Sequence, residues 1–381
     1  MATTLAPHIP PTHPAVVTPA PRAPLETIEV PTVAPGPGQV LIHVLWTSST
    51  PLDLHQADGG LLVSHPAVMG GSYGGTIVHL GPDQPQRNQP LHKGDKVFGF
   101  TFRNKEEKCH QTYLTTDSYM VSKLPANVSF EEAVSVPCNL ITAFNVITAD
   151  FGLELPWPVP KTEENKERDT PIVVWGAAGS VGNYTLQVLK HWGFENVIGV
   201  AREKHHDYLK ELGAKVCFDY TNEDVVDKIL QYVGVAKNGK PRVPYIVDCI
   251  GSLEGTLKKI AKLAESRTKV AVMLPVIVQH ADEDKAPVYE MDVQKVMPGE
   301  WEEGVILKGT RTHFYLSNEF FKDHLQADVV PALLEQGVIK PNKLRVVEGK
   351  TMLERAENAR LILRNQAVSG EKLVWRIADD E

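Results

Sequence analysis

The chain has 381 residues, which exceeds the size of a typical single hydrophobic core, so two domains are expected. A hydrophobic content of 42% and a charged content of 23% are ordinary for a soluble globular protein. The net charge of −8 argues against a nucleic-acid surface, and we find no apolar run long enough to span a bilayer. We therefore expect neither nucleic acid nor a membrane as a partner.

The 4 cysteines are widely scattered and form neither a C-x-x-C pair nor a metal-binding spacing. Cys217 and Cys249 lie in apolar, strand-like runs, and Cys138 and Cys109 are isolated, so buried free thiols are expected for the first two. Free thiols fit a reducing compartment, and no basic segment followed by an apolar core is found at the N-terminus. A cytoplasmic location is therefore expected.

The first third of the chain is rich in short strand-like segments. Residues 1–25 are rich in Pro, Ala and Thr, which predicts an extended or poorly ordered lead-in. Strands are predicted at 40–46, 76–80 and 96–100, with a polar loop over 47–60, and Gly- and Pro-rich turns lie between them. This spacing predicts a β-rich, barrel-like domain that extends to about residue 125.

A helix is predicted to begin after Ser129, because Ser129 and Glu132 have the spacing of a capping box. An apolar helix continues over 140–148, and residues 151–170, rich in Pro, Glu and Lys, predict an exposed loop. From 171 onward strands and helices alternate, as in a parallel sheet. Strands are predicted at 171–175, 196–201, 215–220, 245–250 and 269–274, with a sixth candidate at 304–307; helices are predicted at 180–191, before 212–214, and at 223–233 and 253–264.

The last part of the chain is less regular. Residues 276–303 have no clear period, which favours a lid or a substrate loop. A helix over 318–336, a strand over 344–347, a helix over 352–365 and a strand over 372–377 are then predicted.

The chain is organised around a glycine turn between the strand 171–175 and the helix 180–191. The turn reads Gly176-Ala177-Ala178-Gly179-Ser180-Val181-Gly182, and such a strand, turn and helix form the phosphate cradle of a dinucleotide fold. Gly179 allows the backbone to approach a pyrophosphate, and Gly182 allows close packing of helix and strand. We predict dinucleotide contacts from Ala178, Gly179, Ser180 and Val181.

The end of the next strand indicates NADPH rather than NADH. Ala201 occupies the position where NAD-specific folds carry an acidic residue for the ribose 2′-hydroxyl. Arg202 and Lys204 follow, and both can pair with a 2′-phosphate, in which case Glu203 faces outward. The alternative is that both cations are solvated residues that open a helix. Tyr220, at the end of the third strand, either stacks near the adenine or lies at the edge of the core.

Several segments together resemble the medium-chain dehydrogenase/reductase family; they are Thr50-Pro51-Leu52-Asp53, Gly71-Ser72-Tyr73-Gly74-Gly75-Thr76, Gly94-Asp95-Lys96-Val97, the glycine turn, Leu212-Gly213-Ala214 and Ser369-Gly370-Glu371-Lys372-Leu373-Val374. The resemblance implies an α/β fold in which a GroES-like β-barrel-type domain is interrupted by a Rossmann domain with a doubly wound parallel sheet. It implies a lead-in over 1–25, a GroES-like catalytic domain over 26–147, an NADPH-binding domain over 148–312 and a return to the catalytic domain over 313–381.

The zinc-dependent members of that family place a Cys near the positions of Ser48 and Ser49, and a His-Glu pair at those of Ser72 and Tyr73. Zinc prefers thiolate, imidazole or carboxylate ligands, so we expect no metal here. The chain then resembles the quinone oxidoreductase and enoyl reductase branch, and in particular the fungal trans-acting enoyl reductases. Pro137-Cys138-Asn139-Leu140-Ile141-Thr142-Ala143 and Val247-Asp248-Cys249-Ile250 carry this finer resemblance.

The resemblance implies hydride transfer from NADPH to an activated C=C bond of a small or carrier-bound unsaturated substrate. The enolate oxygen that forms needs a hydrogen-bond donor, and the α-carbon needs a proton. His55 is the candidate donor, with a structural histidine as the alternative. Thr142 is expected against the nicotinamide ribose or carboxamide, unless it bonds its own helix backbone. Tyr73 is expected to border the substrate.

Further cofactor contacts are implied by the resemblance alone; they are Pro51, Asp53, Met273, Leu274, Ser369 and Gly370. Two alternatives remain, namely a quinone or carbonyl reductase on the same fold, and a catalytically idle NADPH-binding partner protein. A P-loop is not present, because Asn183 rather than Lys follows Gly182. The expected assembly is a monomer or a homodimer.

Overall fold

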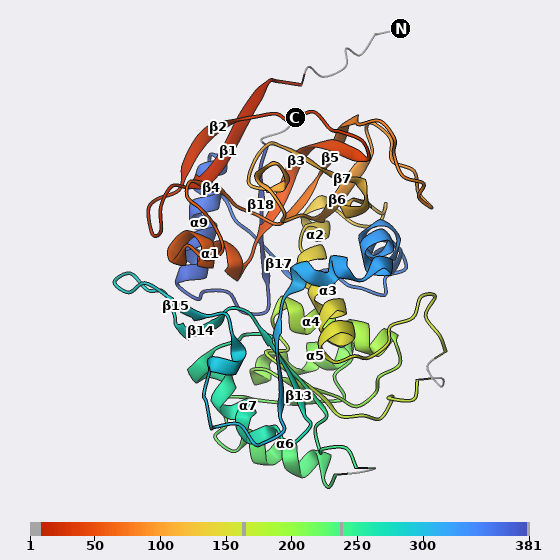
Figure 1. Cartoon of the computed structure of the whole chain (residues 1–381), viewed down its shortest axis with the longest axis vertical. Helices are drawn as coiled ribbons and strands as arrows, with labels where there is room; N and C mark the ends of the chain where they lie inside the picture. Colours follow the sequence, from red (N-terminus) through yellow and green to blue (C-terminus); the bar gives the residue numbers. More distant parts are fainter. Residues whose placement is uncertain (1–8, 162–164, 237–238, 379–381) are drawn as a thin grey trace. The chain divides into compact units, whose positions relative to one another are not determined.

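The computed structural model describes residues 9–161, 165–236 and 239–378. The chain divides into two compact units (Figure 1). The first, here called the barrel unit, combines Met1–Cys138 with Leu316–Glu381, and the second, the Rossmann unit, is Asn139–Tyr315. This interrupted order confirms the predicted fold class. The structure places the junctions at 138/139 and 315/316, where the sequence placed them at 147/148 and 312/313.

The barrel unit is built on a 7-stranded sheet of order β17-β18-β3-β5-β6-β8, with β7 also paired to β3. Its core contains Val40, Ile42, Tyr73, Leu373 and Trp375, which the alternation of strand residues brings to one face. The strands are β3 (Gln39–Ser49), β5 (Ser72–Leu80), β6 (Lys96–Phe100), β7 (Tyr113–Asp117), β8 (Ser122–Lys123), β17 (Leu344–Val346) and β18 (Lys372–Arg376). The helices are α1 (Pro51–Gly59), α2 (Phe130–Ala133), α8 (Val330–Glu335) and α9 (Met352–Arg364).

The predicted lead-in contains a strand that belongs to the barrel unit. β1 (Thr12–Thr18) pairs antiparallel with β2 (Glu26–Pro31) and with β4 (Ala67–Val68). Ala15, Val16 and Val17 in β1 are buried. Hydrophobic burial of this short apolar run therefore orders a segment whose proline-rich surroundings suggested otherwise.

The predicted loop over 47–60 is also more regular than expected. β3 continues to Ser49, and α1 begins at Pro51 after the N-cap Thr50. By contrast, the predicted capping box is present. The Ser129 hydroxyl accepts the Glu132 N–H at 3.2 Å, and the Glu132 carboxylate accepts the Ser129 N–H at 2.9 Å. α2 begins there, as the sequence predicted.

The Rossmann unit has a 6-stranded parallel sheet of order β11-β10-β9-β12-β13-β16, which confirms the predicted alternation. The strands are β9 (Ile172–Trp175), β10 (Val197–Val200), β11 (Val216–Phe218), β12 (Tyr245–Asp248), β13 (Lys269–Met273) and β16 (Ile306–Thr310). The helices are α4 (Ser180–His191), α5 (His206–Leu212), α6 (Val225–Val233) and α7 (Lys258–Leu263); α3 (Pro137–Asn145) crosses the junction between the units.

Two irregular segments differ from their predictions. Residues 276–303 include an antiparallel hairpin of β14 (Val276–Gln279) and β15 (Val288–Glu290), whose shifted register obscures the alternation in the sequence. The predicted helix over 318–336 is a π-helix over Phe321–Val329 that continues into the α-helix α8 (Val330–Glu335). Pro331 has no N–H to donate to the helix ladder at this change.

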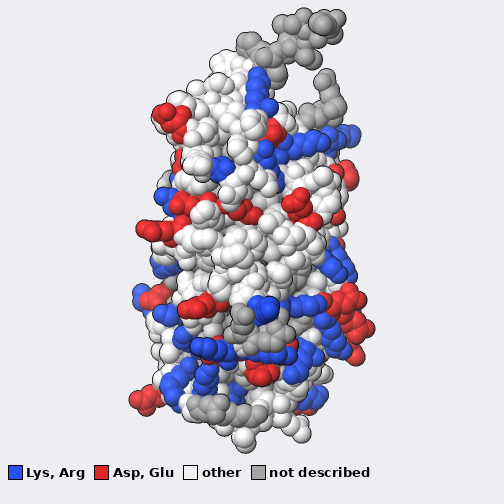
Figure 2. Space-filling view, turned by 90° about the vertical axis from the view of Figure 1, so that its right-hand side faces the viewer, with Lys and Arg blue, Asp and Glu red and all other residues white. Residues whose placement is uncertain are grey.

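The charged segment 151–170 is partly buried. Phe151, Leu153 and Leu155 are buried, whereas the later charged residues form surface ion pairs. Arg168 lies 2.6 Å from Glu195, and Lys240 lies 2.7 Å from Glu167. Figure 2 shows acidic and basic side chains interspersed over one face of the protein. Residues 162–164 of this run lie outside the described residues.

Among the described residues, one helical stretch, Phe130–Asp150, is long and apolar enough to cross a membrane by length and composition alone. It contains Glu131 and Glu132, so it is not an uninterrupted apolar run, and 72% of its most apolar 18-residue window is buried inside the protein. Cys217 and Cys249 are half-buried rather than buried. Cys217 lies in the edge strand β11, and Cys249 follows the end of β12, so each is covered on fewer sides than a central strand residue.

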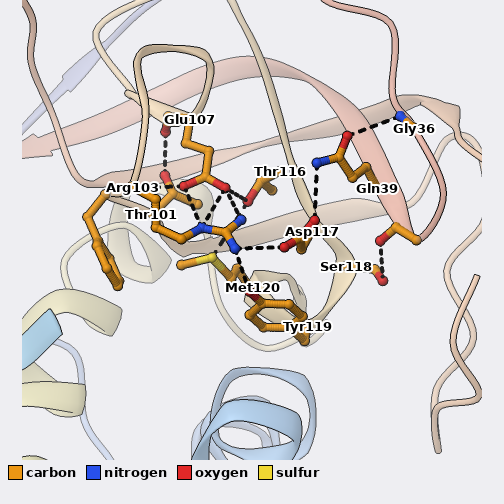
Figure 3. A network of polar contacts seen from close by, with 12 residues as sticks. Gly36, Gln39, Thr101, Arg103, Glu107, Thr116, Asp117, Ser118, Tyr119 and Met120 are labelled. Carbon is orange, nitrogen blue, oxygen red and sulfur yellow. Dashed lines mark hydrogen bonds and ion pairs between the residues drawn. The ribbon is translucent and has the colours of Figure 1, made fainter. Parts of the chain in front are cut away.

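A polar network orders the loop after β6 (Figure 3). The buried Glu107 carboxylate accepts hydrogen bonds from the Arg103 Nε at 3.1 Å and from the Thr116 hydroxyl at 3.1 Å. Arg103 also donates through Nη1 to Asp117 Oδ2 at 2.7 Å. The buried charge of Glu107 is thus compensated within the barrel unit, as buried charges must be.

Candidate functional site

The glycine turn of the Rossmann unit has the backbone geometry that a dinucleotide cradle requires. Gly176 has a φ of 77°, which favours glycine, and a Cβ there would lie 2.7 Å from Ile250 Cγ1. A Cβ on Gly182 would lie 2.6 Å from Ala177 Cα. Residue 182 must therefore be glycine for α4 to pack this closely on the turn. Ala177 is itself buried in the core.

The N-terminus of α4 can hold a phosphate group. Gly179 is its N-cap and has no side chain to satisfy the first N–H groups, while Asn183 N–H bonds back to Gly179 O at 2.8 Å. The N–H groups of Ser180, Val181 and Gly182 come before the first N–H that donates within the helix, that of Asn183, so they can bind an anion at the positive end of the helix dipole. Ala178 lies in the same turn, and the residues present fit a dinucleotide pyrophosphate.

The predicted ribose-phosphate residues meet at the ends of β10 and β11. Arg202 Nε donates to the Tyr220 hydroxyl at 2.8 Å. Arg202, Glu203 and Lys204 are exposed, and the Glu203 N–H donates to Asp219 Oδ2 at 2.8 Å. The structure therefore brings Arg202 and Tyr220 together, with Lys204 two residues further along the same turn.

Sequence reasoning missed a third cation at this place. Lys259, on α7, donates through Nζ to the Tyr220 carbonyl at 2.6 Å. No local pattern distinguishes this lysine from other helix-surface lysines. It approaches Tyr220 only because the tertiary structure brings α7 close to the end of β11.

Thr142, Met273 and Leu274 also belong to the Rossmann unit. Thr142 is buried on α3, and its hydroxyl lies 2.8 Å from that of Thr312. Met273 ends β13 and Leu274 follows it. The Met273 carbonyl lies so close to Gly251 that a Cβ on that glycine would be 2.3 Å away. Met273, Leu274 and Thr312 lie at or just after the carboxyl ends of β13 and β16, where ligands bind in open α/β sheets, and Thr142 reaches this edge through Thr312.

Helix α1 of the barrel unit carries three of the predicted residues. Pro51 is exposed at its start, and His55 is buried with 8% exposure. The Asp53 carboxylate accepts the Thr50 N–H at 2.7 Å and the Gly70 N–H at 3.1 Å. Asp53 therefore holds the start of α1 and the adjacent loop, and both of its oxygens have partners in the protein.

Tyr73 differs from the expectation that it borders the substrate. Its side chain is fully buried in the core of the barrel unit, and its hydroxyl donates to the Met120 carbonyl at 3.1 Å. Strand alternation sends Tyr73 to the core face of β5. Ser369 is exposed and Gly370 has a φ of 72°, and this turn leads into β18.

The structure adds a buried lysine to the barrel unit. Lys372, the first residue of β18, is only 5% exposed, and its amine interacts with the Cys138 thiol and the Asp53 carboxylate. Burial lowers the pKa of the Lys372 amine and raises the pKa of the Cys138 thiol to about 11. Three distant segments thus bring an amine, a thiol and a carboxylate together.

The residues at the positions of zinc ligands do not fit zinc. Ser48, Ser49, Ser72 and Tyr73 offer only hydroxyl groups, and the Tyr73 hydroxyl already donates to Met120. Within residues 9–161, 165–236 and 239–378, no group of three or more His, Cys, Asp or Glu side chains could hold a metal ion.

Two family models match the chain. The alcohol dehydrogenase GroES-like domain matches residues 36–144, in the barrel unit and α3, and the zinc-binding dehydrogenase model matches residues 180–273, in the Rossmann unit.

Similar proteins have been named in fungi and bacteria. The trans-enoyl reductase tazE of Aspergillus terreus is 35% identical over 228 residues, covering 58% of this chain and 73% of that protein. The enoyl reductase component lovC of lovastatin nonaketide synthase, also from Aspergillus terreus, is 24% identical over 89% of both chains. The crystal structure of a quinone oxidoreductase from Pseudomonas syringae superposes with a TM-score of 0.69 at 18% identity, covering 96% of this chain and 99% of that one.

Proposed function

Since the chain belongs to the medium-chain dehydrogenase/reductase family, in its enoyl reductase branch, we propose that it is an NADPH-dependent reductase of activated C=C bonds that works without zinc. The family uses a nicotinamide cofactor, which supplies a hydride when bound. The protein's own residues then hold the cofactor, orient the substrate and stabilise the charge that develops on it.

The choice of NADPH is supported by the Arg202–Tyr220 pair, and this single observation carries the proposal. The hydrogen bond to Tyr220 holds the Arg202 side chain at the end of β10, where the 2′-substituent of a bound dinucleotide lies in this fold. Ala201 offers no carboxylate to repel a phosphate there. Lys204 and Lys259 add positive charge to the same region.

The substrate class is supported by the names of the relatives. Trans-enoyl reductases and the enoyl reductase component of a nonaketide synthase suggest an α,β-unsaturated thioester or ketone, either small or carrier-bound. A quinone or carbonyl reductase is the second candidate, favoured by the structural similarity to a quinone oxidoreductase. The proposal includes a cytoplasmic monomer or homodimer and requires neither nucleic acid nor a membrane.

The test measures oxidation of NADPH and of NADH with an α,β-unsaturated thioester, an α,β-unsaturated ketone and a quinone. We expect turnover with NADPH and the alkenes. Arg202→Ala should raise the KM for NADPH about 10- to 100-fold, the size expected for one lost charge-assisted hydrogen bond, and leave the KM for NADH nearly unchanged.

Lys210→Ala is the matched control, because Lys210 is an exposed cation on α5 that lies 3.7 Å from Asp207. It should change neither KM. Consumption with quinones alone would favour the second candidate. Tight NADPH binding without any turnover would favour the idle binding protein, and a strong preference for NADH would contradict the role of Arg202.

A further inference from the structure

Two buried serine hydroxyls in the barrel unit lack hydrogen-bond partners. Ser48 is 0% exposed and Ser72 is 2% exposed, and neither Oγ atom has a partner among the described residues. Most buried polar side chains in folded proteins are hydrogen-bonded, because burying a hydroxyl without a partner costs free energy. Two such hydroxyls side by side therefore need an explanation.

The two serines face each other across β3 and β5. Ser48 and Ser72 are directly paired in the antiparallel register, so their side chains lie on the same face of the sheet. The neighbouring pair Thr47 and Tyr73 points to the opposite face, where Tyr73 joins the hydrophobic core. The serine pair is therefore on the side of the sheet away from that core.

Lys372 lies on the same face. Val374 pairs with Ser48 in the register of β18 and β3, and Lys372 is two residues before Val374. Because side chains alternate along a strand, Lys372 and Val374 lie on the same face as Ser48. Lys372 is then the diagonal neighbour of Ser48, and such neighbours, about 7–8 Å apart, are within reach of a long side chain. The interaction of the Lys372 amine with Asp53 and Cys138 independently places it near the end of β3.

We propose that the Ser48 and Ser72 hydroxyls, together with the Lys372 amine, bind the carbonyl oxygen of the unsaturated substrate and stabilise the enolate that forms from it. This inference rests on the proposed function and names three residues that it did not include. Both hydroxyls can donate to one oxygen, and a nearby cation compensates the developing negative charge.

The electron balance of the step follows from hydride addition. The hydride brings two electrons to the β-carbon, the C=C π pair moves to form the enolate, and the reduced nicotinamide becomes oxidised. A proton then adds to the α-carbon, which restores the carbonyl and leaves a saturated product. The negative charge thus appears on the oxygen between hydride and proton transfer, when preorganised donors matter most.

The experiment compares Ser48→Ala and Ser72→Ala with the wild-type protein. Each variant should lower kcat for alkene reduction by roughly 10²-fold, as loss of an oxyanion donor does in other enzymes, with the KM for NADPH unchanged. The melting temperature should stay the same or rise, because each variant removes a buried hydroxyl that had no partner. Lys372→Met should also lower kcat.

A binding assay provides a readout that does not depend on turnover. The enolate of acetylacetone, followed by its ultraviolet absorption in the presence of oxidised cofactor, mimics the charged oxygen. Wild-type protein should bind this enolate at least tenfold more tightly than the Ser48→Ala/Ser72→Ala double variant.

Ser118→Ala is the matched control, because Ser118 is equally buried in the barrel unit but its hydroxyl donates to the Gly38 carbonyl at 2.8 Å. It should lower the melting temperature and leave kcat unchanged. If the Ser48 and Ser72 variants retain full kcat in an active enzyme, the inference is wrong while the proposed function stands. If the wild type reduces no activated alkene but binds the enolate through these serines, the proposed function fails and the oxygen site remains.

Discussion

At the scale of single residues, Asp248 is a carboxylate held in an unfavourable environment. It ends β12, is fully buried, and accepts hydrogen bonds from the Thr256 hydroxyl at 2.5 Å and from the Ile250 N–H at 3.0 Å. Burial nevertheless raises its pKa to about 6, so loss of water outweighs these hydrogen bonds. In the sheet Asp248 is paired with Trp175, the residue that directly precedes the glycine turn.

The raised pKa of Asp248 predicts a pH-dependent stability. From about pH 4 to pH 6 the folded state retains a proton that the unfolded chain, with its ordinary pKa of 3.8, has lost. The contribution of Asp248 is therefore fully present below pH 4 and is lost as pH rises through 6, by roughly 3 kcal/mol at 1.36 kcal/mol per pKa unit.

Urea unfolding of the wild type and of Asp248→Asn at pH 4, 5, 6 and 7 tests this. The difference in free energy of unfolding, variant minus wild type, should increase with pH in this window. Parallel profiles for the two proteins would mean that Asp248 is ionised throughout.

At the scale of elements, α1 is attached to α9 by a buried ion-pair cluster. The Asp58 side chain is 0% exposed, and its carboxylate accepts hydrogen bonds from Arg364 Nε at 2.6 Å and from Arg364 Nη2 at 2.7 Å. Arg360 Nη1 adds a third contact at 3.3 Å. His55, the predicted hydrogen-bond donor, lies on the same helix, one turn before Asp58.

Loss of the Asp58 carboxylate should strongly destabilise this pair of helices. Asp58→Ala leaves two guanidinium groups facing a buried position without their anion, so the free energy of unfolding should fall by about 3–5 kcal/mol. The control is Asp224→Ala, since Asp224 forms an exposed pair with Lys228 at 3.0 Å and should contribute less than about 1 kcal/mol. Equal losses from the two variants in urea unfolding would show that the buried cluster has no special role.

At the scale of the whole molecule, we expect neither unit to depend on zinc. The positions at which zinc-dependent relatives carry their ligands have serine and tyrosine hydroxyls here, and the Arg103–Glu107 network connects the residues of the loop after β6. Dialysis against a zinc chelator should therefore change neither the melting temperature nor the rate of NADPH oxidation. A zinc-dependent alcohol dehydrogenase treated in parallel is the positive control. Stoichiometric zinc in the purified protein, or activity restored only by added zinc, would contradict the zinc-free proposal.

Much of the fold could be predicted because its signals are local. The Ser129–Glu132 capping box and the 180–191 helix depend on neighbouring residues, and the structure has both elements where they were predicted. β1 was missed because its short apolar run lies among prolines, and the β14–β15 hairpin was missed because its shifted register breaks the strand period.

In the candidate site, too, some features could be predicted from local sequence and others could not. The sequence by itself determined the glycine turn, the absence of an acid at Ala201 and the cations at Arg202 and Lys204, since each depends on residue type and spacing along one segment. Only the tertiary structure decided that Tyr73 belongs to the core and that Asp53 caps a helix.

The tertiary structure also paired Ser48 with Ser72 and buried the Lys372 amine beside Cys138 and Asp53. These groups are far apart in the sequence. Strand register and helix packing bring them together, and neither can be read from the residues that surround each group.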